Sequence, residues 1–381
     1  MSWETVNLGD LCSVITKGTT PSNIGASFTD SGIKYIRSEM LTSAKFVSGN
    51  FLYISQETHD KLKRSQLKTG DILFSMAGVY LGKTVILRPE DTPSNTNQAV
   101  ALIRIDADKA NNEYVYYYLN MPSVVKTANT VQSQSAQPNI NLKQIGQLKI
   151  KLPDSGTQDK IVQILSAYDS LIENNQKQIK LLEEAAQRLY KEWFVDLRFP
   201  GHEDTPVIDG VPEGWERKAV TDLLEIKYGK DHKALADGAI PVYGSGGIMR
   251  RVQPVLYSGE SVLIPRKGSL NNILYVSGDF WTIDTMFYSI PRIQNIAKYM
   301  YLFLSGLDMY SYNIGAAVPS MTVKILDGIN VLLPSVYILD CFEKAIAPLF
   351  ERSNVLKRQS EAASQIRDRL LPKLMSGEIE V

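Results

Sequence analysis

The sequence contains little cysteine and little histidine. Its 381 residues include only two cysteines, Cys12 and Cys341, and three isolated histidines, His59, His202 and His232. Two cysteines so far apart in the chain build neither a disulfide framework nor a cysteine-based zinc site. The histidines form no cluster of metal ligands, and none of them stands out as a general base. We therefore expect no metal site in this chain.

An excess of charge and long apolar runs are also absent. Lys+Arg and Asp+Glu both total 41, so the formal net charge is zero. This balance excludes a strongly basic coat for nucleic acid but allows a local basic face. No apolar run approaches the roughly 18 residues of a membrane span, and the start, Met1-Ser2-Trp3-Glu4, does not look like a signal peptide. We expect a soluble, cytoplasmic protein of two or three domains.

Catalytic motifs are missing as well. The segment Gly78-Val79-Tyr80-Leu81-Gly82-Lys83-Thr84 comes close to a phosphate-binding loop, but the spacing between its glycines is three residues instead of four. We interpret it as a strand–turn–strand motif. No Gly-x-Gly-x-x-Gly follows a strand, no Gly-x-Ser-x-Gly elbow occurs, and no Asn/Asp-Pro-Pro-aromatic motif of amino-methyltransferases is present. The chain therefore reads as a binding protein with no catalytic residues.

The chain contains an internal repeat. Residues 138–153 match residues 319–334 at a constant offset of 181, with both prolines, a lysine and six apolar positions retained. Near the start of each half, Trp3-Glu4 matches Trp215-Glu216 at an offset of 212, so the second globular half is about 31 residues shorter. The ends of the two halves agree and their middles diverge. This pattern is typical of one scaffold used twice with different recognition surfaces.

Each half closes with a long helical pattern. Apolar residues recur in steps of four and three from Ile161 to Trp193, and again seven apart from Phe342 to Leu370, where Ser353, Ser360 and Arg367 interrupt the seam. We expect two helices of roughly 35 residues, about 50 Å each, that bury these seams against one another as an antiparallel coiled coil. A plain amphipathic helix packed on its own domain is the alternative. The predicted pairing residues are Leu165, Ile172, Asn175, Ile179, Leu182, Leu189, Leu349, Leu356, Ala363 and Leu370.

Two details of the seams carry their own expectations. Asn175 is polar at a core position, a choice that fixes register at some cost in stability. Pro348 lies inside the second pattern and is expected to kink or delay that helix.

The predicted fold class is α+β, with two β-rich domains in tandem, each followed by a long helix. The domains are expected at residues 1–157 and 200–337 and the helices at 158–199 and 338–381. Short strands are expected at 71–75, 85–87, 99–105, 261–265 and 285–290, where runs are bounded by Gly, Pro, Asn and Ser. Short helices rich in tyrosine and aliphatic residues are expected at 113–119 and 296–304.

Several loops in both halves combine cations, amides and hydroxyls. Arg, Asn and Gln read base edges, whereas Lys, Ser and backbone amides beside Gly hold phosphates. Each loop alone is equally well explained as solvated surface. In the first half the candidates are Lys17, Thr19, Thr20, Lys61, Lys63, Arg64, Ser75, Gly78, Lys83, Asn97, Gln98, Gln132, Ser133, Gln134 and Gln137. In the second half they are Tyr243, Gly244, Ser245, Arg250, Arg251, Arg266, Lys267, Gly268, Ser269, Asn271, Asn272, Tyr312 and Asn313.

The charge of each half supports DNA binding only in part. Residues 1–157 hold 16 basic and 13 acidic side chains, and residues 200–337 hold 12 and 14. Sequence-independent affinity for DNA normally needs a cationic surface. A cationic partner that shares the DNA would supply it.

Several strings, in this order, resemble the specificity (S) subunit of type I restriction–modification enzymes, and the resemblance covers nearly the whole chain. The most telling strings close the two helices: LYKEWFVDLRFPG at residues 189–201 and LLPKLMSGEI at residues 370–379. The others are Pro212-Glu213-Gly214-Trp215, residues 240–245, 266–269 and 70–73, and the pair Trp281 with Asp284-Thr285.

The resemblance implies a non-catalytic subunit in which each target-recognition domain reads one half of a bipartite DNA sequence. The helices would act as a ruler between two major-groove sites about one helical turn apart and would dock two methyltransferase subunits. In that family, motor–nuclease subunits join this core. S-adenosylmethionine, ATP and Mg²⁺ would be used by those partners, with none bound by this chain.

Two other interpretations stay open. A two-lobed adaptor would bind proteins through its helices and no DNA through its lobes. A stand-alone DNA methyltransferase or nuclease, which the missing motifs disfavour, would bind S-adenosylmethionine in the isolated chain.

Overall fold

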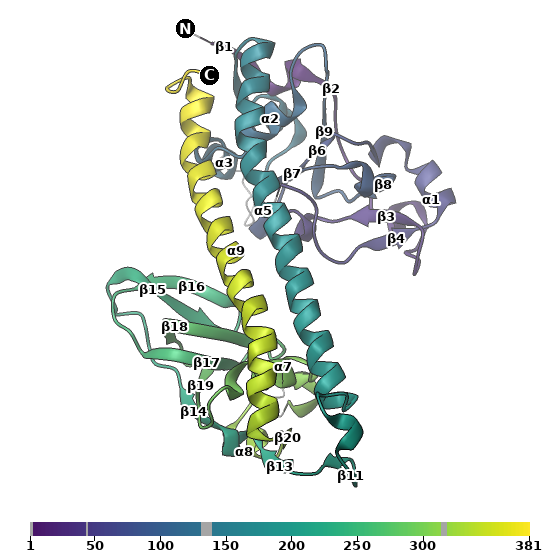
Figure 1. The fold of residues 1–381 in the computed structure, drawn as a ribbon. Coiled ribbons are helices and arrows are strands. Elements are labelled where there is room, and N and C mark those ends of the chain that lie inside the picture. The colour runs from purple at the N-terminus through teal and green to yellow at the C-terminus, as the bar shows by residue number, and fades with distance from the viewer. Residues whose placement is uncertain (1–2, 43–44, 131–138, 314–317) are drawn as a thin grey trace. The chain divides into compact units, whose positions relative to one another are not determined.

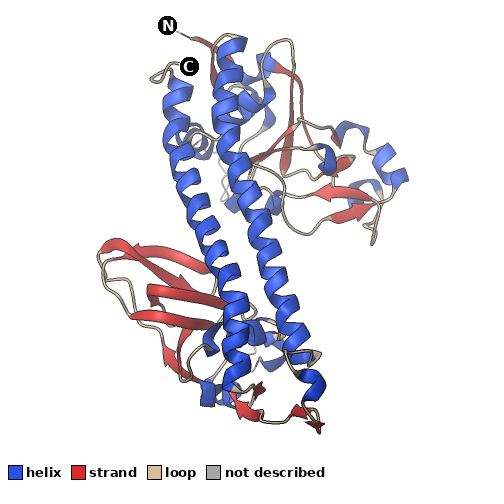
Figure 2. Ribbon diagram, viewed as in Figure 1, coloured by secondary structure: helices blue, strands red, loops and turns tan. Residues whose placement is uncertain are grey.

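The structure, a computed structural model, describes residues 3–42, 45–130, 139–313 and 318–381. The chain forms two compact units. Unit 1 holds Met1–Asn175 together with Arg358–Val381, and unit 2 holds Gln176–Lys357. Figure 1 labels the elements. Figure 2 shows that the strands lie, together with short helices, in the globular part of each unit, and that the chain also has two long helices.

Unit 1 begins with a β-rich domain. Its elements are β1 (Glu4–Asn7), η1 (Leu8–Leu11), β2 (Cys12–Lys17), η2 (Pro21–Ile24), β3 (Ile33–Ile36), η3 (Ser38–Met40), β4 (Leu52–Ile54), α1 (Gln56–Lys61), η4 (Lys63–Ser65), β5 (Gln66–Leu67), β6 (Ile72–Ser75), η5 (Gly78–Tyr80), β7 (Thr84–Ile86), η6 (Pro89–Asp91), β8 (Ser94–Thr96), β9 (Val100–Ile105), α2 (Asn112–Leu119), α3 (Pro122–Thr130), α4 (Leu142–Gly146) and β10 (Lys149–Leu152).

Unit 2 contains the second β-rich domain. Its elements are the π-helix η7 (Lys191–Val195), η8 (His202–Asp204), β11 (Val207–Ile208), β12 (Val211–Pro212), β13 (Glu216–Ala219), α6 (Val220–Leu223), β14 (Leu224–Tyr228), β15 (Asp237–Gly244), β16 (Gly247–Val252), β17 (Tyr257–Pro265), β18 (Leu274–Thr282), β19 (Met286–Pro291), α7 (Ile296–Ser305), η9 (Met309–Tyr312), α8 (Val323–Asp327) and β20 (Asn330–Leu333).

The predicted short strands and helices are confirmed within one or two residues at most ends. The expected strand at 71–75 is β6, and the expected helix at 113–119 is α2. The strand at 261–265 proves longer, because β17 begins at Tyr257 and pairs with β18 over that extension. Residues 78–84 form the expected turn between β6 and β7.

The terminal strands of both domains reproduce the sequence repeat. In unit 1, β1 pairs antiparallel with β10, with Glu4 opposite Leu152. In unit 2, β13 pairs antiparallel with β20, with Glu216 opposite Leu333. Glu4 and Glu216 are 212 positions apart, and Leu152 and Leu333 are 181 positions apart, the same two offsets as in the sequence. The sequence repeat is therefore also a structural repeat.

The middles of the two domains share one order of four strands but differ in the strands added to it. Unit 1 has the sheets β2-β9-β6-β7 and β4-β3-β8-β5, whereas unit 2 has a single six-stranded sheet, β14-β19-β17-β18-β15-β16. The order β2-β9-β6-β7 corresponds to β14-β19-β17-β18. In unit 2 the sheet continues because β18 also pairs in parallel with β15, through Val242 and Trp281.

The two long helices are α5 (Ser155–Tyr190) and α9 (Val336–Ser376). Within unit 1 the first half of α5 contacts the last part of α9, where Arg367 pairs with Asp169. Within unit 2 the second half of α5 contacts the first part of α9, where Lys357 pairs with Glu183. The helices therefore pair antiparallel. The expectation that Pro348 delays the second helix is wrong, because α9 begins twelve residues before this proline and continues beyond it.

Some seam residues pack in the domain cores and others are buried only between the two helices. Leu165 is part of the core of unit 1, and Leu370 packs against that core. Leu189 and Leu349 pack against the core of unit 2. The middle of the seam lies outside both cores: Asn175, Leu356 and Ala363 are buried, and Ile172, Ile179 and Leu182 are half-buried. Part of each helix therefore pairs with the other helix, and part of it packs on its own domain, as the two interpretations of the sequence had expected.

Each domain is fastened to the start of its own long helix by the same contact. The N-cap residue of α2, Asn111, donates a hydrogen bond to Asp159 at 2.8 Å. The N-cap residue of α7, Asn295, donates to Asp340 at 2.8 Å. Asp159 and Asp340 stand 181 positions apart, so this junction belongs to the repeat.

The predicted domain boundaries at 157, 199 and 337 stay a prediction, since the two compact units each combine one domain with parts of both helices. Within the described residues, no helix is both long enough and apolar enough to cross a membrane.

Candidate nucleic-acid interface

A glycine at the end of one edge strand fixes a loop junction in each unit. A Cβ on Gly18, after β2, would lie 1.9 Å from the carbonyl oxygen of Thr96, and a Cβ on Gly229, after β14, would lie 2.0 Å from that of Ile283. Only glycine allows this approach of two backbones. The amides that follow donate to the opposite loop, from Thr19 to Thr96 at 3.1 Å and from Lys230 to Thr282 at 2.8 Å.

Three more backbone hydrogen bonds are equivalent in the two units. Gly18 N–H donates to Val100 at 3.3 Å, Met76 to Ala99 at 2.8 Å, and Ile140 to Met76 at 2.9 Å. Their counterparts run from Gly229 to Met286 at 3.2 Å, from Arg266 to Thr285 at 2.8 Å, and from Met321 to Arg266 at 2.9 Å. Each unit therefore joins three loops into one edge. We call these edges rim 1 (residues 17–20, 76–80 and 96–99) and rim 2 (residues 228–231, 266–270 and 282–285).

Rim 1 gathers many of the candidates predicted in the first half. Arg64 donates to the hydroxyl of Thr19 at 3.4 Å, and Gln98 accepts a hydrogen bond from Asn23 at 3.2 Å. The side-chain Oδ1 of Asn97 accepts a hydrogen bond from the Ala99 amide at 3.2 Å, which shapes the loop. Exposed or half-buried members of the rim and its flank are Lys17, Thr19, Thr20, Lys63, Arg64, Gly78, Asn97 and Gln98. Cations, hydroxyls and amides thus lie together on one edge.

Two lysines close to rim 1 already have partners. Lys61 forms an exposed ion pair with Glu57 at 2.6 Å. Lys83 places its ammonium 6.0 Å from the ring centroid of Tyr80. Both ammonium groups stay at the surface or half-buried, so DNA phosphate would compete with weak local contacts.

Ser75 is a wrong prediction. Its side chain is fully buried at the end of β6, and its hydroxyl has no hydrogen-bond partner among the described atoms. The sequence placed it beside the glycine turn, but β6 is buried on both of its faces, so a side chain at its end is buried as well. Gln132, Ser133, Gln134 and Gln137 lie outside the described residues.

Rim 2 gathers most of the candidates of the second half. The Asn272 side chain donates to the Ser245 carbonyl at 2.8 Å, which ties the β15–β16 turn to the loop after β17. The Tyr310 hydroxyl donates to the Gly268 carbonyl at 3.3 Å, and the Asn313 side chain accepts from the Ser320 amide at 2.8 Å. Asn271 contacts Asp308 at 3.2 Å. The structure thus brings together Ser245, Arg266, Lys267, Gly268, Ser269, Asn271, Asn272, Tyr312 and Asn313.

Arg266 is the most organised cation of rim 2. Its guanidinium lies 5.3 Å from the ring centroid of Tyr228 and donates to the Asp284 carbonyl at 3.2 Å. Tyr228 is itself 54% exposed. A guanidinium stacked on an aromatic ring keeps its free edge oriented, as bidentate recognition of a base requires.

Four other predicted residues of the second half serve the fold. Arg250 donates to the carbonyls of His232 and Leu235, at 3.3 and 3.0 Å, and pairs with Asp237 at 2.5 Å, which holds the β15–β16 hairpin to the preceding loop. Arg251 donates to the Ala239 carbonyl at 3.0 Å.

Gly244 is buried, and a Cβ there would lie 2.6 Å from the Met249 sulfur. The half-buried Tyr243 packs in a small core with Phe280. Tyr243, Gly244, Arg250 and Arg251 thus all make contacts within the fold, and their predicted contact with DNA stays a prediction.

Sequence reasoning missed two members of rim 2. Tyr228 and Lys230 are exposed and stand where Lys17 and Thr19 stand in rim 1. The signal was available, because Gly18 matches Gly229 at an offset of 211, one less than the 212 at the start of each half, and this offset carries residues 17–19 onto 228–230.

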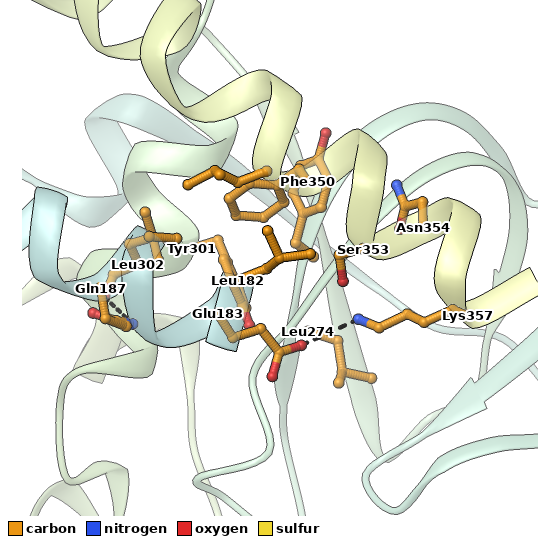
Figure 3. A pocket seen from close by; sticks show the side chains of 13 residues that line it. Leu182, Glu183, Gln187, Leu274, Tyr301, Leu302, Phe350, Ser353, Asn354 and Lys357 are labelled. Atoms are coloured by element: carbon orange, nitrogen blue, oxygen red, sulfur yellow. Dashed lines mark hydrogen bonds and ion pairs between the residues drawn. The ribbon is translucent and has the colours of Figure 1, made fainter. Parts of the chain in front are cut away.

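A small apolar cavity of about 130 Å³ in unit 2 lies between the two helices and the domain (Figure 3). Leu182, Tyr301 and Phe350 line it, and the 3.3 Å Lys357–Glu183 ion pair lies at its side. Ser353 also faces it, with a buried hydroxyl that has no partner among the described atoms. The residues that line this cavity include no histidine, no cysteine and no paired carboxylates.

The described part of the chain holds no group of three or more His, Cys, Asp or Glu side chains arranged to bind a metal ion. The polar groups of the two rims are donors and acceptors on loops, which suits binding.

Comparison with known proteins agrees with this organisation. A family model described as the type I restriction modification DNA specificity domain matches residues 1–184 and 212–353. The MjaIX type I restriction enzyme specificity subunit of Methanocaldococcus jannaschii is 25% identical, over 100% of this chain and 94% of that protein. The HindI specificity subunit of Haemophilus influenzae is 22% identical, over 83% of this chain and 88% of that protein.

A solved structure shares the fold. The type I restriction–modification system S subunit from M. genitalium superposes with a TM-score of 0.59 at 18% identity, covering 98% of this chain and 96% of that chain. Because the family model covers most of the sequence and both of its repeats, the chain belongs to the type I restriction–modification DNA specificity (S) subunit family.

Proposed function

We propose that this chain reads a bipartite DNA sequence, with one half-site facing rim 1 and the other facing rim 2. The observation that supports this proposal is the set of four equivalent backbone hydrogen bonds that builds both rims. A loop junction kept through two otherwise divergent domains indicates a shared task, while the different side chains on it indicate different targets.

The residues of each rim and of its flank would have two kinds of contact with DNA. Lys17, Lys63 and Arg64 in unit 1, and Lys230 and Lys267 in unit 2, would hold phosphates and set the register. Asn97 and Gln98 in unit 1, and Arg266 and Asn272 in unit 2, would approach base edges.

The near-neutral charge of the chain points to partners. We propose that α5 and α9 dock two methyltransferase subunits, whose own surface supplies cationic contacts to the same DNA. Motor–nuclease subunits would join this core. S-adenosylmethionine, ATP and Mg²⁺ would bind to those partners, and this chain would bind none of them. The assembly would act in the cytoplasm.

The proposal is tested by selection from a pool of random DNA duplexes. The assembled complex of this chain with its methyltransferase should retain duplexes that share two short motifs at a fixed gap. A stable complex that retains no particular sequence would instead support the two-lobed adaptor. Saturable binding of S-adenosylmethionine by the isolated chain would support the stand-alone enzyme.

A further inference from the structure

Rims 1 and 2 carry equivalent turns of opposite chemistry. The turn after β6 begins with Met76 and the turn after β17 begins with Arg266, and these residues make the same two backbone hydrogen bonds in their units. The next residues, Ala77 and Lys267, each form an isolated bridge, to Asn139 and Ser320. Gly78 and Gly268 follow, with φ of 71° and 87°. Val79 therefore stands where Ser269 stands.

The turn of rim 2 is polar throughout, with Arg266, Lys267 and Ser269 exposed or half-buried. The turn of rim 1 is apolar. Met76 and Leu81 anchor it in the core of unit 1. Between them, Val79 is 89% exposed, which makes it the most exposed large hydrophobic side chain among the described residues.

Val79 adds nothing to the core of unit 1, and its neighbours already fix the turn. A single exposed apolar residue is ordinary on a protein surface. Here, however, the residue lies in the turn that Met76 joins, through its hydrogen bond to Ala99, to the loop of Asn97 and Gln98. The equivalent position in rim 2 holds the hydroxyl of Ser269. Under the proposed function this position faces the target, and a valine side chain has only methyl groups with which to contact it.

We infer that Val79 contacts the 5-methyl group of a thymine in the major groove. The first half-site then contains an A·T pair at the position facing this turn. This inference rests on the proposed function. The 5-methyl group is the apolar feature of the major-groove edge, and aliphatic side chains recognise thymine through it. The turn of rim 2, with Arg266, instead presents donors suited to the acceptors of guanine.

The test uses the complete complex and the target found by duplex selection. Each thymine of the first half-site is replaced in turn by deoxyuridine, which lacks only the methyl group. With the native chain, one replacement should weaken binding about fourfold, the size expected for burial of one methyl-sized group. Replacements in the second half-site serve as the internal comparison.

Variants then assign the effect to one side chain. Val79→Ser, which copies the residue of rim 2, should bind thymine DNA about fourfold more weakly and lose no further affinity on the sensitive deoxyuridine duplex. Val79→Thr, which keeps one methyl group, should fall between. The matched variant Ser269→Ala should retain the full sensitivity of the first half-site. Because Val79 and Ser269 are both exposed, all three variants should unfold at the same temperature as the native chain.

Two failures are distinguishable. A clear bipartite target with no sensitive thymine in the first half-site, or with unchanged sensitivity in Val79→Ser, would overturn the role of Val79 and leave the proposed function standing. Absence of any selected sequence would overturn both.

Discussion

Arg367 of α9 donates a hydrogen bond to Asp169 of α5 at 2.6 Å inside unit 1. Asp169 is buried and also accepts a hydrogen bond from the Tyr117 hydroxyl of α2, while the Lys45 ammonium lies 3.9 Å from it. The arginine that interrupts the second heptad seam is thus a specific partner of the first helix and of the domain. A polar pair at this position favours one register of the two helices.

Replacing Arg367 with Met should destabilise the protein by about 2–3 kcal/mol, because a buried carboxylate loses its strongest partner while Tyr117 and Lys45 remain. Adding Asp169→Leu should recover part of that loss. Denaturant unfolding of both variants measures the effect. Arg369→Met, at an exposed position two residues along the same helix, should stay within about 0.5 kcal/mol. Equal loss in both single variants would argue against a specific pair.

Arg266→Ala should relax or abolish recognition in the second half-site alone. Discrimination at one base pair should fall by about 1–3 kcal/mol, and the first half-site should be read as before. The readout is the base preference at each position of the selected duplexes. Arg292, exposed at the other end of β19, provides the control, and Arg292→Ala should change neither half-site. Equal loss at both half-sites in Arg266→Ala would contradict the assignment.

Leu182→Ala should lower stability without changing base preference. Leu182 is half-buried and already borders a cavity, so truncation enlarges an empty space and should cost about 2–3 kcal/mol. Its neighbour Leu181 is 63% exposed, and Leu181→Ala should be nearly neutral. Thermal unfolding distinguishes the two. An unchanged midpoint in Leu182→Ala would remove this residue from the helix pair.

Unit 2 should show an acid-sensitive contact at Glu260. Lys298 donates to Glu260 and to Glu343, each at 2.6 Å, and the Tyr275 hydroxyl also donates to Glu260. Burial alone would raise the pKa of Glu260, but the hydrogen bonds from Lys298 and Tyr275 hold this pKa below the ordinary 4.5. The pKa of Lys298 is raised, because its two carboxylate partners outweigh its burial, so it stays charged over the same range.

A carboxyl group with a lowered pKa stabilises the fold above its ordinary pKa, and that contribution is lost as the pH falls through the folded value. Glu260→Gln should therefore be less stable than the native chain at pH 7, by about 1 kcal/mol because the pair is partly exposed. The difference should shrink below pH 4.5. Unfolding at pH 7 and at pH 3.5 measures it, with the exposed Glu351→Gln as control. A difference that stays constant with pH would exclude this ionic role.

The repeated parts of the fold were predictable because they depend on local pattern. The segments at offsets 212 and 181 hold the strand pairs Glu4–Leu152 and Glu216–Leu333, and their alternation and turns are visible in the sequence. The divergent middles were not predictable. Whether the sheet is extended beyond β18 by β15 depends on parallel pairing between strands far apart in the sequence, which no local pattern specifies.

The candidate interface was predictable as loops but not residue by residue. Composition brought in Ser75 and Arg250, yet Ser75 is buried and Arg250 makes hydrogen bonds within the fold. Tyr228 was not among the predicted residues, because an aromatic side chain carries no polar signal of its own, although the repeat offset pointed to its position. The exposure of Tyr228 and Val79 is visible only in the structure.

A map of methylated bases tests the central claim most directly. The chain would be expressed with its methyltransferase in a host without such systems, and modified bases located by single-molecule sequencing. The account predicts one motif made of two short, specific parts separated by a fixed gap, with Arg266→Ala relaxing only one part. An uninterrupted motif, or no modification by a complex shown to be assembled, would contradict the claim that the two rims read separate half-sites.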